Sequence, residues 1–120
     1  MLFEVAKTSD IPEGEARRFV VDRIEIAVAN LGNGQFLAVD DICSHAEASL
    51  SEGEVDTDRE TIECPRHGST FDLRTGKPKT LPATVPIAIF PVKVEGETIL
   101  IELEDRKWHG RLTRSTRRKR

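Results

Sequence analysis

Two short pairs of cysteine and histidine constrain this 120-residue chain more than any other feature. The first pair is Cys43-x-His45 and the second is Cys64-x-x-His67, with 18 residues between the pairs. Such short spacings let one loop present two ligands to one metal centre, and two such loops complete a four-ligand site. Thiolates suit soft or borderline ions and iron–sulfur clusters, whereas imidazole suits zinc, copper and iron. We therefore predict that these four residues hold a metal centre.

The spacing alone leaves two kinds of metal centre open. Zinc accepts two cysteines and two histidines in tetrahedral geometry. Zinc-finger spacing groups cysteine with cysteine and histidine with histidine, whereas each loop here carries one of each. In a Rieske centre, two histidines replace two cysteines on one of the two irons of a [2Fe–2S] cluster. A disulfide between the two cysteines is disfavoured, because each lies beside a histidine at ligand spacing.

The remaining sequence predicts short strands separated by turns. Leu31-Gly32-Asn33-Gly34 predicts a hairpin, and Pro86 and Pro91 indicate an edge position or a bulge in the strand that they interrupt. No segment keeps a helical period over three turns. We expect an all-β base made from both chain ends, with a loop-rich insert at residues 41–83. The predicted strands cover residues 2–6, 16–21, 24–30, 35–40, 61–64, 70–73, 85–94 and 98–103.

Charge divides the chain into an acidic body and a basic tail. All 21 acidic residues and ten of the 18 basic residues lie in residues 1–105, which gives that part a net charge of −11. Residues 106–120 carry eight basic residues and no acidic one. We expect this segment to be a solvated, disordered tail with no specific nucleic-acid partner. The Asp40-Asp41 pair and the series Asp56, Asp58, Glu60 predict a solvated acidic face, with a docking surface as the alternative.

We expect neither a secretion signal nor a membrane-spanning segment. The first residues show no basic region followed by an apolar run. No stretch approaches the roughly 20 apolar residues that a membrane-spanning helix needs. We therefore expect a cytoplasmic protein in a reducing compartment, without a membrane partner.

The residues around the two ligand pairs carry a family resemblance. Residues 43–53 (CSHAEASLSEG) and 64–77 (CPRHGSTFDLRTGK) resemble the two cluster loops of Rieske ferredoxins. The similarity is strongest to the small ferredoxin component of bacterial ring-hydroxylating dioxygenase systems, and it covers residues 1–105. It implies a Rieske-like antiparallel β-sandwich base, made of residues 1–40 and 84–105. The same resemblance implies a smaller cluster-binding subdomain over residues 41–83.

The resemblance also implies a role for individual residues. One [2Fe–2S] cluster per chain would be held through Cys43 and Cys64 on the inner iron. His45 and His67 would hold the outer iron near the surface. Pro82 would belong to a loop that shields the cluster.

Residues beside the ligands predict the reduction potential, because hydrogen bonds to the sulfurs, charge and exposure all affect it. High-potential Rieske proteins carry an extra cysteine pair, plus a serine and a tyrosine after the second histidine. By resemblance, Ser69 corresponds to that serine, and Phe71 stands where the tyrosine would be. The alternative for Ser69 is a simple turn-forming role. The extra cysteines are missing, since the chain has only two. We expect a potential in the lower part of the Rieske range of roughly −150 to +300 mV.

The function implied by this resemblance is one-electron transfer. The protein would take electrons from a flavin reductase and pass them to an oxygenase, and it would not itself be an enzyme. Two alternatives stay open at this point. One is an accessory protein in redox sensing or iron–sulfur assembly, and the other is a structural zinc module that binds a partner.

Overall fold

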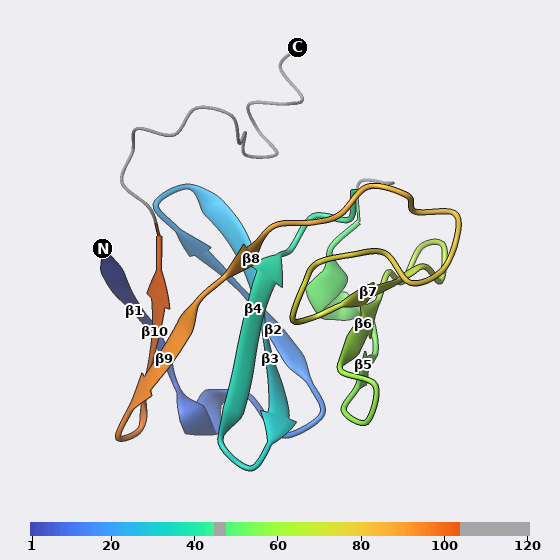
Figure 1. The fold of residues 1–120 in the computed structure, drawn as a ribbon. Helices are drawn as coiled ribbons and strands as arrows, with labels where there is room; N and C mark the ends of the chain where they lie inside the picture. Colours follow the sequence, from blue (N-terminus) through green and yellow to red (C-terminus); the bar gives the residue numbers. More distant parts are fainter. Residues whose placement is uncertain (45–47, 104–120) are drawn as a thin grey trace.

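A computed structural model describes residues 1–44 and 48–103 of the chain. Within these residues, ten strands form three antiparallel sheets (Figure 1), and two short 3-10 turns, η1 (Thr8–Asp10) and η2 (Leu50–Glu52), lie between strands. The first sheet has the order β1-β10-β9, the second β2-β3-β4-β8 and the third β5-β6-β7. The strands are β1 (Leu2–Lys7), β2 (Ala16–Val21), β3 (Ile24–Gly32), β4 (Gln35–Asp40), β5 (Val55–Asp56), β6 (Thr61–Glu63), β7 (Thr70–Asp72), β8 (Ile89–Phe90), β9 (Val92–Glu95) and β10 (Thr98–Glu102).

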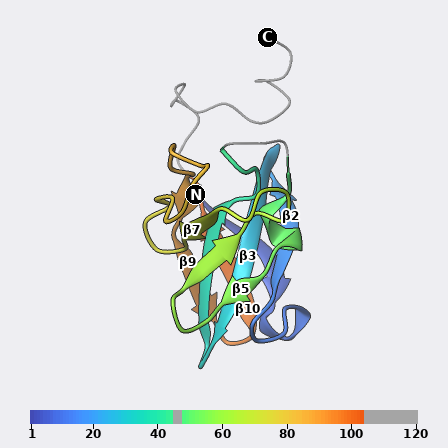
Figure 2. The same cartoon turned by 90° about the vertical axis from the view of Figure 1, so that its right-hand side faces the viewer.

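The four-stranded sheet is the middle layer of the molecule (Figures 1 and 2). On one face of β3, Ile26 and Val28 join a core that also contains Ile99 and Ile101 of β10. On the other face, Ala27 and Ala29 join a second core, which contains residues of the small third sheet. The base is therefore a sandwich of the first two sheets, and the third sheet packs against the outer face of that sandwich. This arrangement confirms the predicted all-β, antiparallel fold.

Most strand predictions match the structure. The predicted strands at residues 16–21 and 35–40 coincide with β2 and β4, and the others among residues 2–40 differ by one or two residues at an end. Asn33 and Gly34, with φ of 55° and 77°, form the predicted turn between β3 and β4.

The single predicted strand at residues 85–94 is wrong. Residues 85–88 are not a strand, β8 pairs with β4 in the middle sheet, and β9 pairs with β10 in the first sheet. Pro91 stands where the chain crosses from one sheet to the other, and proline has no N–H with which to continue a ladder. The expected edge position is confirmed, because β8 and β9 each lie at the edge of a sheet.

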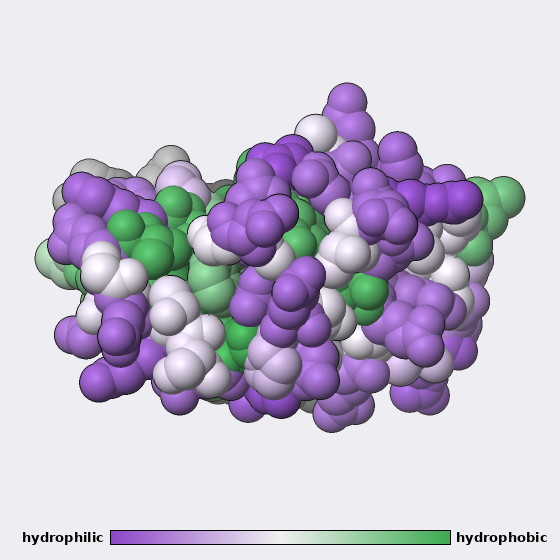
Figure 3. All heavy atoms as spheres, turned by 90° about the horizontal axis from the view of Figure 1, so that it is seen from below, coloured by the Kyte–Doolittle hydropathy of each residue, from purple (hydrophilic) through white to green (hydrophobic). Residues whose placement is uncertain are grey.

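The third sheet organises the loop-rich insert. Strands β6 and β7 form a hairpin with β5 along one side, and η2 connects the end of β4 to β5. The loops that follow β4 and β6 lie at the same end of the molecule, the upper right in Figure 1. The opposite end, seen from below in Figure 3, is covered mainly by hydrophilic residues, with smaller hydrophobic patches between them. The two loops at the upper end carry the predicted metal ligands.

Two sequence predictions fall outside the described residues: the ligand role of His45 and the state of the basic tail at residues 106–120. Among the residues that are described, no helix is long and apolar enough to cross a membrane.

Candidate metal centre

The first ligand loop is the segment between β4 and η2 that carries Cys43, and its two ends are hydrogen-bonded to each other. The backbone N–H of Cys43 donates to the carbonyl oxygen of Ala48 (3.1 Å), and the N–H of Leu50 donates to that of Asp41 (2.7 Å). Between these two bonds, Ile42 and Ser49 form an isolated antiparallel bridge. Cys43 therefore lies at the closed neck of the loop, where the backbone on both sides is fixed.

The second ligand loop is the turn of the β6–β7 hairpin. The N–H of Cys64 donates to the carbonyl oxygen of Ser69 (2.7 Å), and the N–H of Gly68 donates back to that of Cys64 (2.9 Å). Gly68 adopts φ of 77°, a conformation that disfavours side chains, so glycine suits this position. The tight turn places Cys64 at its base and His67 at its tip.

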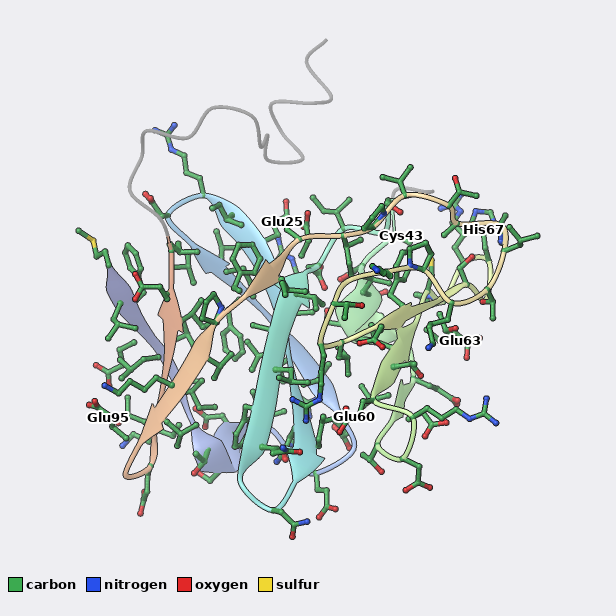
Figure 4. The ribbon with its side chains drawn as sticks, viewed as in Figure 1. Glu25, Cys43, Glu60, Glu63, His67 and Glu95 are labelled. Carbon is green, nitrogen blue, oxygen red and sulfur yellow. The ribbon has the colours of Figure 1, made fainter. Side chains whose placement is uncertain are left out.

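The predicted ligands in the described residues divide into buried thiols and an exposed imidazole. Cys43 is 3% exposed and Cys64 is fully buried, both are free of disulfide bonds, and both belong to the second core. His67 is exposed, and it lies at the same end of the molecule as Cys43 (Figure 4). The two predicted sulfur ligands are thus shielded from water, while the predicted histidine ligand His67 faces solvent.

A third loop, residues 79–86, is fastened to both ligand loops. The N–H of Ala83 donates to the Ser69 hydroxyl (3.1 Å), and the Ser44 hydroxyl donates to the carbonyl oxygen of Val85 (2.5 Å). Leu81 and Pro82 are exposed and are joined by a cis peptide bond, whereas Ala83 is buried. The structure therefore places the predicted shielding loop next to the two ligand loops.

Ser69 and Phe71 lie beside the second ligand loop, where the sequence predicted a tuning role. Both are fully buried, and Phe71 packs in the same core as Cys43 and Cys64. The Ser69 hydroxyl accepts the hydrogen bond from Ala83, so its own hydrogen remains available to donate elsewhere. Phe71 has no hydroxyl group to donate.

Asp41 corrects a prediction. The sequence predicted a solvated acidic face at Asp40-Asp41, but Asp41 is fully buried and Asp40 is half-buried. Asp56 and Asp58 do lie exposed, whereas Glu60 is half-buried. The adjacent charges in the sequence gave no indication that the chain would fold a serine-rich segment over Asp41.

One ion pair of the small subdomain has perturbed titration. Arg74 donates from Nε and Nη2 to the two carboxylate oxygens of Glu60, at 2.5 Å and 3.1 Å. This hydrogen-bonded pair holds the pKa of Glu60 below its ordinary value, and it raises the pKa of Arg74. The pair links the turn before β6 to the turn after β7, so it supports the hairpin rather than the ligands.

The donor set fits a [2Fe–2S] cluster. Within residues 1–44 and 48–103, no three His, Cys, Asp or Glu side chains gather closely enough to hold one metal ion. A Rieske cluster makes a weaker demand, because it shares its four protein ligands between two irons. Two buried thiols in one core, neither of them in a disulfide, with an exposed imidazole at the same end of the molecule, match that division.

Comparison with known proteins identifies the class. A model of the Rieske [2Fe–2S] domain family matches residues 1–91. The chain therefore belongs to the Rieske [2Fe–2S] domain family. The predicted cofactor, one [2Fe–2S] cluster per chain, is confirmed, and the alternative of a structural zinc module is wrong.

Relatives within the family narrow the class to dioxygenase ferredoxins. The 3-phenylpropionate/cinnamic acid dioxygenase ferredoxin subunit of Escherichia coli is 48% identical over 97 residues, covering 81% of this chain and 89% of the relative. The ferredoxin of carbazole 1,9a-dioxygenase from Nocardioides aromaticivorans has a TM-score of 0.83 and 35% identity, over 87% of this chain and 99% of its own. These similarities confirm a Rieske ferredoxin that carries electrons and is not itself an enzyme.

A further solved structure contains a ferredoxin together with its oxygenase. It is described as a complex of reduced oxygenase and oxidized ferredoxin in carbazole 1,9a-dioxygenase, with a TM-score of 0.75 and 39% identity. The match covers 86% of this chain and 97% of the other.

Proposed function

We propose that Cys43, His45, Cys64 and His67 are the four ligands of the cluster. The observation that carries this proposal is the presence in one core of two buried thiols, neither of them in a disulfide, each at the base of its own closed loop. Structural cysteines are commonly buried, but here each one is followed within three residues by a histidine. The cysteines would hold the inner iron and the histidines the outer iron.

The resulting centre would transfer single electrons at the exposed end of the molecule. The cluster, when bound, supplies a reversible one-electron couple. The chain excludes water from the two sulfur ligands and holds their loops by backbone hydrogen bonds. The exposed His67 brings the outer ligand to the surface, where a partner protein can approach.

The partners would be a flavin reductase as electron donor and a ring-hydroxylating oxygenase as acceptor. The similarity to dioxygenase ferredoxin subunits, and to a ferredoxin solved with its oxygenase, supports this assignment. We place the protein in the cytoplasm, because a reducing compartment keeps both thiols available for the cluster. The alternative of an accessory role in redox sensing or iron–sulfur assembly is not favoured by any feature of the described residues.

The surrounding residues would have supporting roles. Ser69 would donate its free hydrogen toward a cluster sulfur, and the loop of Pro82 would shield the cluster, because Ala83 of that loop is anchored to Ser69. Residues 41–83 would form the cluster-binding subdomain, with residues 1–40 and 84–105 as the base. Truncation after Asp105 would therefore leave the optical and EPR signals unchanged.

The ligand assignment is tested on the purified protein by optical and EPR spectroscopy. The wild-type protein should be red-brown and should give an EPR signal when reduced. Cys64→Ala should abolish both properties, and His67→Ala should lose or alter them. Arg66→Ala is the matched control, because Arg66 is an exposed neighbour of His67 in the same turn. A normal Rieske spectrum in Cys64→Ala would contradict the assignment.

The electron-transfer role needs a separate measurement. The reduced protein should be oxidised rapidly by a ring-hydroxylating oxygenase. A flavin reductase should then reduce it again at least as fast as the oxygenase turns over. Normal spectra together with slow transfer to every oxygenase tested, and a stable complex with assembly proteins, would favour the accessory role instead.

A further inference from the structure

The carboxylate of Asp41 is buried two residues before the first proposed ligand. Asp41 is fully inaccessible to solvent, and only two other polar or charged residues in the described part of the chain, Thr61 and Ser69, are buried. A buried carboxylate is costly unless it is hydrogen-bonded and paired. The partners of this carboxylate therefore indicate what it does.

Those partners come from the far side of the first ligand loop. The N–H of Ser51 donates to Oδ1 of Asp41 (2.8 Å), and the hydroxyl of Ser49 donates to Oδ2. The two serine hydroxyls are 3.0 Å apart, so they form one small network with the carboxylate. The backbone adds a third link, from the N–H of Leu50 to the carbonyl oxygen of Asp41. Asp41 thus joins the strand entering the loop to the segment leaving it.

A second set of contacts ties Asp41 to the base. Its N–H donates to the carbonyl oxygen of Glu25 in β3 (2.9 Å). Arg18 of β2 places Nε 3.6 Å from Asp41 Oδ2, and its Nη2 lies 3.1 Å from the carboxylate of Glu25. One cation therefore faces two carboxylates, one of them buried under the ligand loop.

We propose that Asp41 is a positioning residue for the cluster. Its hydrogen bonds hold the two ends of the first ligand loop together, an effect called the clamp below, and its carboxylate places a buried negative charge near the cluster that Arg18 balances. The proposal rests on the assignment of Cys43 and His45 as ligands. The clamp acts through geometry, because the neck that it closes is the segment that carries Cys43. The charge acts through space, because a buried negative group disfavours the addition of an electron nearby.

These two effects make separable predictions. Asp41→Asn removes the charge and part of the clamp, so the reduction potential should rise and the cluster should be lost faster in the presence of a chelator. Substitution of residues that support metal ligands typically lowers metal affinity or activity by about 10- to 100-fold. We therefore expect Asp41→Asn to lose its cluster about tenfold faster than the wild-type protein. Ser49→Ala weakens the clamp but keeps the charge, so it should speed cluster loss with a smaller change in potential. Arg18→Gln should lower the potential.

Matched controls distinguish these effects from general destabilisation. Asp56 also accepts two backbone hydrogen bonds, from Asp58 and Arg59, but it is exposed at the end of β5. Asp56→Asn should leave the potential, the EPR line shape and the rate of cluster loss unchanged. Arg17, which pairs with Glu15 at 2.8 Å, is the control for Arg18. Arg17→Gln should have a smaller effect on the potential.

The experiment uses the full-length holoprotein and compares film voltammetry, EPR of the reduced state and loss of visible absorbance. Potentials that shift in the same direction in Asp41→Asn and Arg18→Gln, or that match the controls, would overturn the proposed charge effect. If Asp41→Asn fails to fold, Ser49→Ala and Arg18→Gln still decide the question. A wild-type protein without Rieske signals would instead refute the ligand assignment, which is a different failure.

Discussion

The hydroxyl of Ser69 accepts a hydrogen bond from the backbone N–H of Ala83 across a distance of 3.1 Å, and both residues are buried. This bond joins the second ligand loop to the loop that contains Pro82. Because the hydroxyl serves as the acceptor, its own hydrogen is free for a second contact. One side chain can therefore hold the shielding loop in place and also donate toward the cluster.

Replacing Ser69 by alanine should affect both stability and potential. The N–H of Ala83 would lose its buried partner, which costs about 1–3 kcal/mol of unfolding free energy. Loss of a donor near the cluster sulfurs should also lower the reduction potential. Denaturant unfolding and protein-film voltammetry measure the two effects.

Thr80→Val is the control for Ser69→Ala. Thr80 lies in the same loop as Ala83, and its hydroxyl accepts a hydrogen bond from the Thr70 N–H at an exposed position. The Thr80→Val substitution should leave the reduction potential unchanged. An equal potential in the wild-type protein and in Ser69→Ala would show that Ser69 acts only as an anchor.

Gly53 is the position where a single added methyl group should do the most damage to the first ligand loop. A Cβ atom there would lie 1.6 Å from the carbonyl oxygen of Glu63, the residue before Cys64. Backbone must move to relieve this overlap, so Gly53→Ala should lower the unfolding free energy by about 1–3 kcal/mol or more. The cluster should also be incorporated less completely, as measured by iron content per chain.

Gly96→Ala provides the comparison for Gly53→Ala. Gly96 has nothing within 4 Å of an added Cβ, so only its φ of 62° opposes the change. It should keep a full iron content. A Gly53→Ala protein with full iron content and wild-type stability would show that the two ligand segments can separate without consequence.

Local signals in the sequence predicted most of the base. Alternating apolar residues located β2 and β3, a short apolar run located β4, and the Asn33-Gly34 pair located the turn between β3 and β4. These signals succeed because strand alternation and turn conformation depend on neighbouring residues. The two cysteine–histidine pairs identified the candidate site for the same reason, since ligand spacing is local.

Features that depend on distant parts of the chain were not predicted. Ile26 and Val28 alternate along β3 and lie in the core of the base, but Ala27 and Ala29 on the opposite face are buried too, in the core shared with the small third sheet. Alanine is compatible with either environment, so the second buried face left no clear pattern. The burial of Asp41 similarly requires Ser49 and Ser51 to fold over it.

The two cores on either side of the middle sheet should respond differently to cavities. Ile62 packs with Cys43 and Cys64 in the core under the ligand loops, whereas Ile26 packs in the core of the base, and both are fully buried. Truncation of either to alanine should cost about 2–5 kcal/mol of unfolding free energy. Only Ile62→Ala should also accelerate loss of visible absorbance in the presence of a chelator.

Comparing these two variants at matched unfolding free energy removes the effect of overall stability. If Ile26→Ala loses the cluster as fast as Ile62→Ala, the two cores act as one cooperative unit. The prediction that only the second core affects retention of the cluster would then be wrong.

The Glu60–Arg74 pair should give a stability contribution that depends on pH in a defined direction. The hydrogen bonds from Arg74 hold the pKa of Glu60 below its ordinary value of 4.5 in the folded state. A carboxyl with a lowered folded-state pKa stabilises the protein above its unfolded-state pKa, and the contribution is lost as pH falls through the lowered value. Arg74→Gln should therefore reduce Tm slightly at neutral pH, because the pair is solvent-screened. The difference in Tm from the wild-type protein should shrink as the pH falls below 4.5.

Arg59→Gln is the control, since Arg59 lies 3.9 Å from Asp56 and its substitution should change Tm less at every pH. A Tm difference for Arg74→Gln that persists or grows in acid would show that Arg74 stabilises the hairpin by packing rather than by its charge.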